Sequence, residues 1–105
     1  MHIYLSGSIS NNENYLNDFI AAEQEIKAMF PQATIINPLT YGEVLKNSQK
    51  SSYADLLLLG MNMLSKCDGI FLLESWTQSN GAIAEYWYAL ALGLEVFYQN
   101  NQTKM

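Results

Sequence analysis

Residues 67–93 constrain the fold more than any other segment, because they combine a strand, a polar loop and a helix in one unit. Residues 70–73 are apolar throughout, as expected of a strand that is buried on both faces. Residues 74–80 are polar, and residues 81–92, rich in small side chains, are predicted to form a helix that closes at Gly93. A strand whose carboxyl end leads through a loop into a helix N-terminus is where open α/β sheets bind ligands.

The rest of the chain continues the alternation of strand and helix. Strands are predicted at residues 2–5, 33–36, 68–73 and 94–98, and helices over about residues 13–30, 53–66 and 81–92. The first helix has Asn11 or Asn12 as its cap, a mostly helical apolar stripe from Leu16 to Phe30, and Pro31 at its end. Residues 39–52 are predicted to form a long loop with one short helical turn, and such a loop in a small domain is often functional.

This order of elements predicts an α/β protein with a mostly parallel sheet and right-handed crossovers. The loops that lead from a strand to the next helix then open at one edge of the sheet. Residues 6–10, 37–52 and 74–80 are therefore expected to converge at that edge.

The composition is that of a globular domain. We expect the 105 residues to form one domain over residues 1–105, with residues 99–105 as a frayed tail. The low charged fraction, 14%, and the many aromatic residues favour buried contacts between subunits. The single cysteine, Cys67, excludes an internal disulfide and fits a reducing cytoplasm. No apolar run approaches the ~20 residues of a membrane span, and the N-terminal apolar segment is too short for a signal peptide.

The charge balance limits the partners. A net charge of −5 with only five basic residues argues against binding duplex nucleic acid, which needs a basic patch. It leaves open a single nucleotide held by backbone N–H groups and hydroxyls. No spaced set of metal ligands is visible, and no Ser–His pair is available because His2 is the only histidine.

Glu85 is the candidate of most interest, because it is the only charged residue in its predicted helix. In one interpretation it is a carboxylate kept ionised by the helix N-terminus and aimed into the crevice, where it can attack an electrophilic sugar carbon. In the other it is a solvated acid that complements the helix dipole. Position alone does not separate the two, but burying a lone carboxylate is costly without a purpose.

Other candidates have a functional and a simpler interpretation. Ser79, Asn80 and Gly81 precede the helix and suit a phosphate or a 5′-hydroxyl, but an ordinary helix cap is the simpler and favoured interpretation, and both can hold at once. The loop Ser6, Gly7 and Ser8 permits close backbone approach but lacks the further glycines and the lysine of a phosphate loop. Trp76 either stacks on a base or packs down over the core, and Asp68 more often closes a turn than takes part in catalysis.

Several motifs occur in order along the chain. They are Ile-Tyr-Leu-Ser-Gly-Ser-Ile at residues 3–9, Ile-Asn-Pro at 36–38, Cys-Asp-Gly-Ile at 67–70 and Trp-x-x-Ser-x-Gly-Ala-x-x-Glu at 76–85. In this combination the chain resembles the nucleoside 2-deoxyribosyltransferase-like superfamily, with its short, often phage-encoded members as the nearest match. The resemblance covers nearly the whole chain.

The resemblance implies a flavodoxin-like or Rossmann-like three-layer sandwich, with a parallel sheet of four to five strands in the order 2-1-3-4 and helices on both faces. It implies cleavage of the N-glycosidic bond of deoxynucleosides or their 5′-monophosphates, with transfer of the sugar to another base or to water and without a metal or redox cofactor. It also implies a homodimer or larger homo-oligomer with shared sites. Tyr86, Trp87, Tyr88 and residues 53–66 are the candidates for that interface.

The residue roles that the resemblance implies follow its motifs. Glu85, in the Gly-x-x-x-Glu context, is the nucleophile, and Ser79 contacts a 5′-phosphate. The remaining substrate-binding candidates are Ser6, Gly7, Ser8, Asn37, Trp76, Asn80 and Gly81, with Asp68 in support. Relatives usually place an aspartate about eight residues before the Asp of the third strand, where it helps to protonate the leaving base; counting back from Asp68 gives Gly60 instead.

Two functions therefore stay open. The first is an enzyme that cleaves or transfers the glycosidic bond through Glu85. The second is a module that binds or sequesters a nucleotide-derived ligand in the same crevice without cleaving it, which Gly60 favours because general acid–base help is worth about 10²–10⁴-fold in rate. A small interaction protein with a vestigial pocket is a third, simpler interpretation.

Overall fold

A computed structural model describes residues 1–9, 12–39 and 53–99 of the chain. Its centre is a parallel sheet of four strands in the order β2-β1-β3-β4. The strands are β1 (His2–Ser6), β2 (Thr34–Ile36), β3 (Gly69–Leu72) and β4 (Glu95–Tyr98). The predicted α/β class, the parallel pairing and the strand order are all confirmed.

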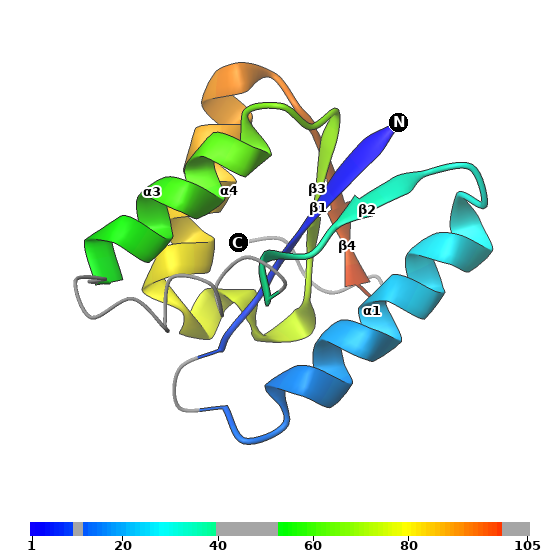
Figure 1. The fold of residues 1–105 in the computed structure, drawn as a ribbon, viewed down its shortest axis with the longest axis horizontal. Helices are drawn as coiled ribbons and strands as arrows, with labels where there is room; N and C mark the ends of the chain where they lie inside the picture. The colour runs from blue at the N-terminus through cyan, green and yellow to red at the C-terminus, as the bar shows by residue number, and fades with distance from the viewer. Residues whose placement is uncertain (10–11, 40–52, 100–105) are drawn as a thin grey trace.

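Helices cover both faces of the sheet (Figure 1). Helix α1 (Tyr15–Met29) lies on one face, and α3 (Tyr53–Leu64) and α4 (Asn80–Leu92) lie on the other. Alternate residues of β1 enter the two cores: Ile3 and Leu5 pack toward α1, whereas Tyr4 packs with residues of α3 and α4. This period of two is the geometry of a strand buried on both faces, so β1 fixes which side chains can reach each helix layer.

Helix α1 is shorter and less deeply buried than its sequence pattern predicts. It begins at Tyr15, and its cap, Asn14, makes no side-chain capping bond. Asn12, one of the two predicted caps, instead accepts a hydrogen bond from the Asn14 backbone N–H in a turn that precedes the helix. Phe19 and Ile26 face the sheet, but Leu16 and Ile20 of the predicted stripe are 52% and 55% exposed. The apolar stripe is therefore wider than the surface that the sheet covers.

Two predictions at the carboxyl edge of the sheet are wrong. The predicted polar loop 74–80 is mostly a 3₁₀ helix, η1 (Glu74–Gln78). Gln99, predicted to belong to a frayed tail, is buried: its Oε1 accepts a hydrogen bond from the Glu74 N–H at 2.9 Å, and its Nε2 donates to Glu25 Oε2 at 3.1 Å. A polar side chain that bridges η1 and α1 therefore anchors the end of β4. The predicted loop 39–52 lies outside the described residues from position 40 onward.

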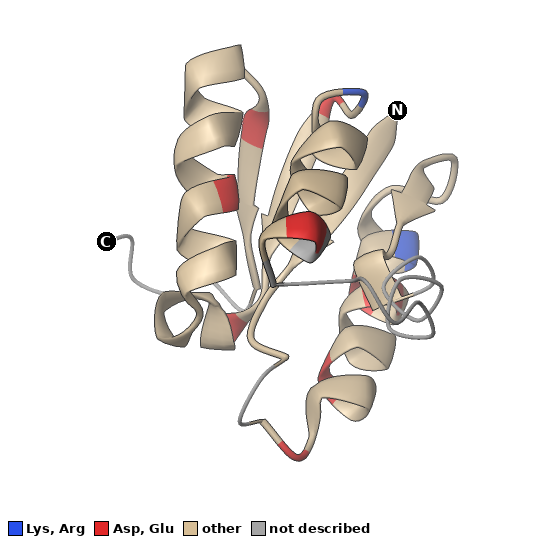
Figure 2. Cartoon of the chain, turned by 60° about the vertical axis from the view of Figure 1, so that its left-hand side comes forward, with Lys and Arg blue, Asp and Glu red and all other residues tan. Residues whose placement is uncertain are grey.

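The helices of the described part of the chain are too short or too polar to cross a membrane. Figure 2 shows acidic positions on several elements and few basic ones. The two lysines among the described residues are Lys27, in the last turn of α1, and Lys66, in the turn before β3. Both segments lead toward the amino ends of strands, so neither lysine serves the opposite edge, where ligands bind in folds of this kind.

Candidate active site

The Glu85 carboxylate is held by two hydroxyl groups of β1. Tyr4 donates its hydroxyl hydrogen to Glu85 Oε2 at 2.7 Å, and Ser6 donates to Oε1, also at 2.7 Å. All three side chains are buried, and Glu85 is only 9% exposed. Tyr4 and Ser6 share one face of β1 because they are two residues apart, and that face looks toward α4.

Helix geometry aims Glu85 at the carboxyl edge of the sheet. Glu85 lies in the second turn of α4, and long helical side chains lean toward the helix N-terminus. That N-terminus follows η1 and β3, so it stands at the carboxyl ends of the strands. Gly81, one turn earlier on the same helix face, has no side chain to cover the carboxylate. The arrangement therefore points a buried acid toward the edge where α/β sheets bind ligands.

The electrostatics of Glu85 and Tyr4 differ from the sequence prediction. Burial raises the pKa of the Glu85 carboxyl group, and the hydrogen bonds from Tyr4 and Ser6 lower it in part. Burial, reinforced by the nearby Glu85 charge, raises the pKa of the Tyr4 phenol far above its ordinary value. Tyr4 therefore keeps its proton and acts as a donor. Hydroxyl groups, rather than the helix N-terminus predicted to keep Glu85 ionised, are the direct partners of the carboxylate.

Tyr4 was not among the candidates predicted from sequence. It stands between Ile3 and Leu5 and looks like one more apolar strand residue. A signal was nevertheless present, since a tyrosine in the middle of a strand buried on both faces needs a partner for its hydroxyl. Its spacing of two from Ser6 also places both hydroxyls on one face.

The N-terminus of α4 combines a cap with free backbone donors. Ser79 is the cap: its Oγ accepts a hydrogen bond from the Ala82 N–H at 3.1 Å. This is the simpler role considered for Ser79. The first N–H groups of any helix have no intrahelical partner, so this end also suits an anion such as a 5′-phosphate. Asn80 is exposed and Gly81 is half-buried beside it.

The first loop is pinned against the segment that follows β3. The Ser8 N–H donates to Ser75 Oγ at 3.0 Å. A Cβ on Gly7 would lie 2.9 Å from the Leu73 Cβ, so only glycine allows this approach. Ser6, Gly7 and Ser8 therefore form one rim of the carboxyl edge, and Ser6 alone of the three bonds Glu85.

Two predicted site residues lie elsewhere. Asp68 precedes β3 at the amino edge, where its Oδ2 accepts a hydrogen bond from the His2 N–H at 2.7 Å, so it closes the sheet at the edge opposite Glu85. The predicted supporting role for Asp68 at the site is therefore wrong, because its carboxylate lies at the amino edge of the sheet. Asn37 follows β2 at the correct edge, but its amide donates to Glu23 Oε1 at 3.0 Å and its Oδ1 accepts from the Leu39 N–H. It anchors the β2 turn to α1.

Trp76 packs into the core. Its side chain is fully buried, with its ring 4.8 Å from that of Tyr86 and 6.4 Å from that of Tyr98, centroid to centroid. The packing alternative therefore holds, and no base can stack on this ring in the observed conformation. Its indole Nε1 is buried with no hydrogen-bond partner among the described residues.

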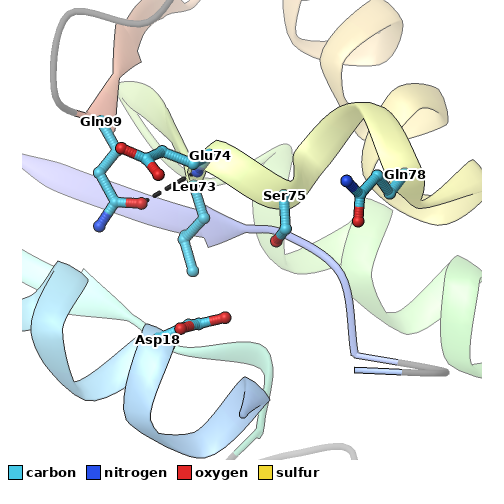
Figure 3. Close-up of a pocket in the computed structure, with 6 residues that line it drawn as sticks. All are labelled: Asp18, Leu73, Glu74, Ser75, Gln78 and Gln99. Carbon is cyan, nitrogen blue, oxygen red and sulfur yellow. Dashed lines mark hydrogen bonds between the residues drawn. The ribbon is translucent and has the colours of Figure 1, made fainter. Parts of the chain in front are cut away.

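A hollow of about 330 Å³ opens at the same edge but on the α1 side of the sheet. Figure 3 shows Asp18 of α1 facing Leu73 and Ser75 across it. Glu74, Gln78 and Gln99 complete its lining, so Glu85 and its hydroxyl partners are not part of it. With Asp18 and Glu74 in its wall, the hollow repels a phosphate and is no extension of an anion site. Within the described ranges, no group of three or more His, Cys, Asp or Glu residues could hold a metal ion.

Comparison with known proteins agrees with this architecture. The structure superposes on a 2-desoxiribosyltransferase from Leishmania mexicana with a TM-score of 0.66 and 18% sequence identity, over 98% of this chain and 66% of that chain. The chain thus has the same fold as that protein, which is the fold that the resemblance of its motifs implied. It belongs to the family described as domain of unknown function DUF4406, which matches residues 1–98.

Two curated proteins are also similar in sequence. Nucleoside diphosphate kinase homolog 5 is 36% identical in Mus musculus and 33% identical in Homo sapiens, over 81 residues in each case. The match covers 74% of this chain but only 38% of either relative. The chain therefore spans well under half the length of these proteins, and their kinase name describes them alone.

Proposed function

We propose that this chain cleaves or transfers the N-glycosidic bond of a nucleoside or nucleotide, with Glu85 as the nucleophile. The observation that carries the proposal is the buried Glu85 carboxylate between the hydroxyls of Tyr4 and Ser6, aimed at the carboxyl edge of the sheet. Burying a lone acid costs free energy that a merely structural residue would not repay. The fold shared with a 2-desoxiribosyltransferase supports the same reaction class.

In the proposed reaction a Glu85 oxygen attacks the anomeric carbon, C1′, of the sugar. The bond from C1′ to the base nitrogen breaks through an oxocarbenium-like transition state, and its electron pair leaves with the base, which takes a proton from solvent. The resulting glycosyl ester is resolved when water or a second base attacks C1′ and returns the electron pair to Glu85. Tyr4 and Ser6 orient the carboxylate throughout and keep their own protons.

Recognition of a 5′-phosphate at the α4 N-terminus belongs to the same proposal. Asn80 and Gly81 present backbone N–H donors, and Ser79 a hydroxyl, at the helix end that favours anions; the Ser79 N–H itself donates to the Trp76 carbonyl. Neither lysine of the described segments stands at this edge, so the binding would rest on dipoles rather than on a cation. Such a site accepts a single phosphate and does not attract a polyanion.

The decisive experiment incubates the protein with deoxynucleosides and with their 5′-monophosphates and separates free base by chromatography. Base release is expected with the wild-type chain and is expected to vanish in Glu85→Gln, which keeps the shape of the side chain but cannot attack. Glu95→Gln makes the same change at an exposed residue at the start of β4 and is expected to retain activity. Release that persists unchanged in Glu85→Gln would refute the proposal.

Binding without cleavage is the second candidate function. The burial and hydrogen bonding of the Glu85 carboxylate favour it. Both carboxylate oxygens already accept hydrogen bonds from buried hydroxyls, and burial raises the pKa of the acid, which disfavours the ionised nucleophile. This function predicts that the ligand is recovered intact after denaturation of the complex. Recovery of free base would exclude it.

We further propose that the chain self-associates through the outer face of α3 and α4. Trp87 and Leu90 of α4 are 58% and 42% exposed, and Leu58 of α3 is 65% exposed. The two helices pack against each other on the same face of the sheet (Figure 1). Large apolar side chains gathered on one face are typical of subunit interfaces.

A further inference from the structure

Gly60 occupies an unusual position for a glycine. It lies in the interior of α3, where glycine is about 1 kcal/mol less favourable than alanine. Its backbone does not need glycine, because Gly93 is the one glycine with positive φ among the described residues. The reason for glycine at position 60 must therefore be sought in its surroundings.

Gly60 lies directly against the Tyr4 hydroxyl and the Glu85 carboxylate. A Cβ built on Gly60 would lie 2.5 Å from Glu85 Oε2 and 2.8 Å from the Tyr4 hydroxyl oxygen, and the next nearest atom is Glu85 Cδ at 3.7 Å. Real Cβ atoms essentially never approach a neighbour below 3.0 Å. Any side chain at position 60 would therefore displace the hydroxyl or the carboxylate, and the helix backbone itself forms the wall over their hydrogen bond.

The two oxygens of Glu85 are consequently in different environments. Oε2 is held by Tyr4, deep in β1, and is covered by the backbone of α3 at Gly60. Oε1 is held by Ser6, the last residue of β1, two positions nearer to the carboxyl edge. Oε1 is thus the oxygen nearer to the edge where a substrate would enter.

We propose that Gly60 is a positioning residue for Glu85: its missing side chain lets α3 close over the Tyr4–Glu85 bond, which fixes Oε2 and leaves Oε1 to face the substrate. This inference rests on the proposed function for its catalytic meaning. Its structural content, the dependence of the Tyr4–Glu85 bond on a bare backbone at position 60, stands independently of any reaction.

The first test is a stability cycle of Gly60→Ala in two backgrounds. In the wild-type background the new methyl group meets the carboxylate, so the melting temperature is expected to fall. In the Tyr4→Phe/Glu85→Ala background all three nearest atoms are gone, and the helix gain of alanine is expected to leave the melting temperature unchanged or raised. An equal fall in both backgrounds, or failure to fold in both, would overturn the inference.

The second test reads the position of the carboxylate directly. The pKa of Glu85 is followed by NMR of a carboxyl-labelled glutamate in wild type, Gly60→Ala, Tyr4→Phe and the double variant. Loss of the Tyr4 donor removes stabilisation of the charged form, so Gly60→Ala and Tyr4→Phe are each expected to raise the pKa by about one unit or more, and the double variant no further. Asn62→Ala, an exposed change on the same helix, is the control and is expected to leave the pKa unchanged.

An unchanged pKa in Gly60→Ala, or additive shifts in the double variant, would contradict the positioning role. The two proposals fail separately. If the wild-type chain releases no base, the proposed function fails while the titration still decides the role of Gly60. If base is released, Gly60→Ala is expected to lose at least tenfold in rate at neutral pH, with no further loss on adding Tyr4→Phe.

Discussion

The Tyr4 hydroxyl and Glu85 Oε2 are 2.7 Å apart although 81 positions separate the two residues in the chain. The bond joins the central strand β1 to the last helix, α4, and it is made where both groups are buried. A hydrogen bond to a charged group is worth about 1.5–3 kcal/mol, so this contact orients the acid and offsets part of the rise in its pKa that burial causes.

Tyr4→Phe is expected to move the pH dependence of base release to higher pH. The variant loses a donor to the charged form, so the already raised pKa of Glu85 rises further, by about one unit or more, and the ionised nucleophile is populated later. Rates measured across the pH range for Tyr4→Phe and wild type test this. Tyr15→Phe, the same change at the start of α1, is expected to leave the profile in place; a profile unmoved by Tyr4→Phe would argue against the assigned role.

Stability and activity are expected to respond to pH in opposite directions. Because the folded pKa of Glu85 lies above its unfolded value, the folded state binds more protons between the two values. The stability that Glu85 contributes is therefore fully present below the unfolded pKa and is lost as pH rises through the folded pKa. Base release needs the ionised acid and rises over the same window.

Urea denaturation of wild type and Glu85→Gln over about pH 4 to 8 measures the linkage. The stability of wild type relative to Glu85→Gln should fall as pH increases, because the glutamine cannot ionise. A difference that is constant with pH would mean that Glu85 has the same pKa in both states.

Ser79 variants separate the helix cap from phosphate recognition. Ser79→Ala is expected to cost about 1 kcal/mol of stability through loss of the cap. Ser79→Asp retains a capping oxygen but adds a negative charge at the helix end, so it is expected to bind 5′-monophosphates about tenfold less well or worse while tolerating nucleosides. Ser79→Asn keeps the cap without the charge and serves as control. Equal losses for both substrate types in Ser79→Asp would place the phosphate elsewhere.

Gly60→Asp is expected to impair the site rather than supply a missing acid. The new side chain would begin 2.5 Å from Glu85 Oε2, so two carboxyl groups would compete for one position and one of them would take up a proton. The rate of base release at neutral pH is expected to fall at least tenfold, consistent with loss of one oriented donor (about 10²–10³-fold in other sites). A faster variant would show that an acid at this position can still protonate the leaving base.

Trp87→Glu is expected to weaken self-association. The substitution places a charge in the centre of the exposed apolar face of α4, where burial against a second copy would be costly. Sedimentation velocity of wild type and variant measures the change in mass. Leu16→Glu, at a similarly exposed apolar residue of α1, is the matched control and should leave the mass unchanged; a wild-type monomer would contradict the assembly.

The fold was predictable from sequence because each strand and helix has its own local signal. The apolar strand 70–73, the Ser79 cap and the closing Gly93, whose φ is 75°, all behave as their residue types require. The helix boundaries shift by a few residues, because turns such as that of Asn12 compete with the helix for backbone donors.

The site was predictable only in part, because its partners come from distant positions. Glu85 and Ser6 stand out in the sequence, but the bond from Tyr4 depends on which face of β1 meets α4, and that is a tertiary property. Asp68 shows the opposite failure: it belongs to a recognisable motif but precedes its strand, and so lies at the wrong edge. Trp76 was ambiguous because a polar neighbourhood in sequence does not reveal burial in the core.

The separation of Tyr4 and Ser6 from Glu85 also has a consequence for how the protein is made. During synthesis β1 is made before α4. The Tyr4 and Ser6 hydroxyls therefore cannot bond Glu85 until α4 has been translated. No N-terminal fragment that stops before α4 can contain the assembled site. Any activity found is therefore a signature of the docked final helix, and its recovery during refolding would report completion of the whole fold rather than formation of an early part.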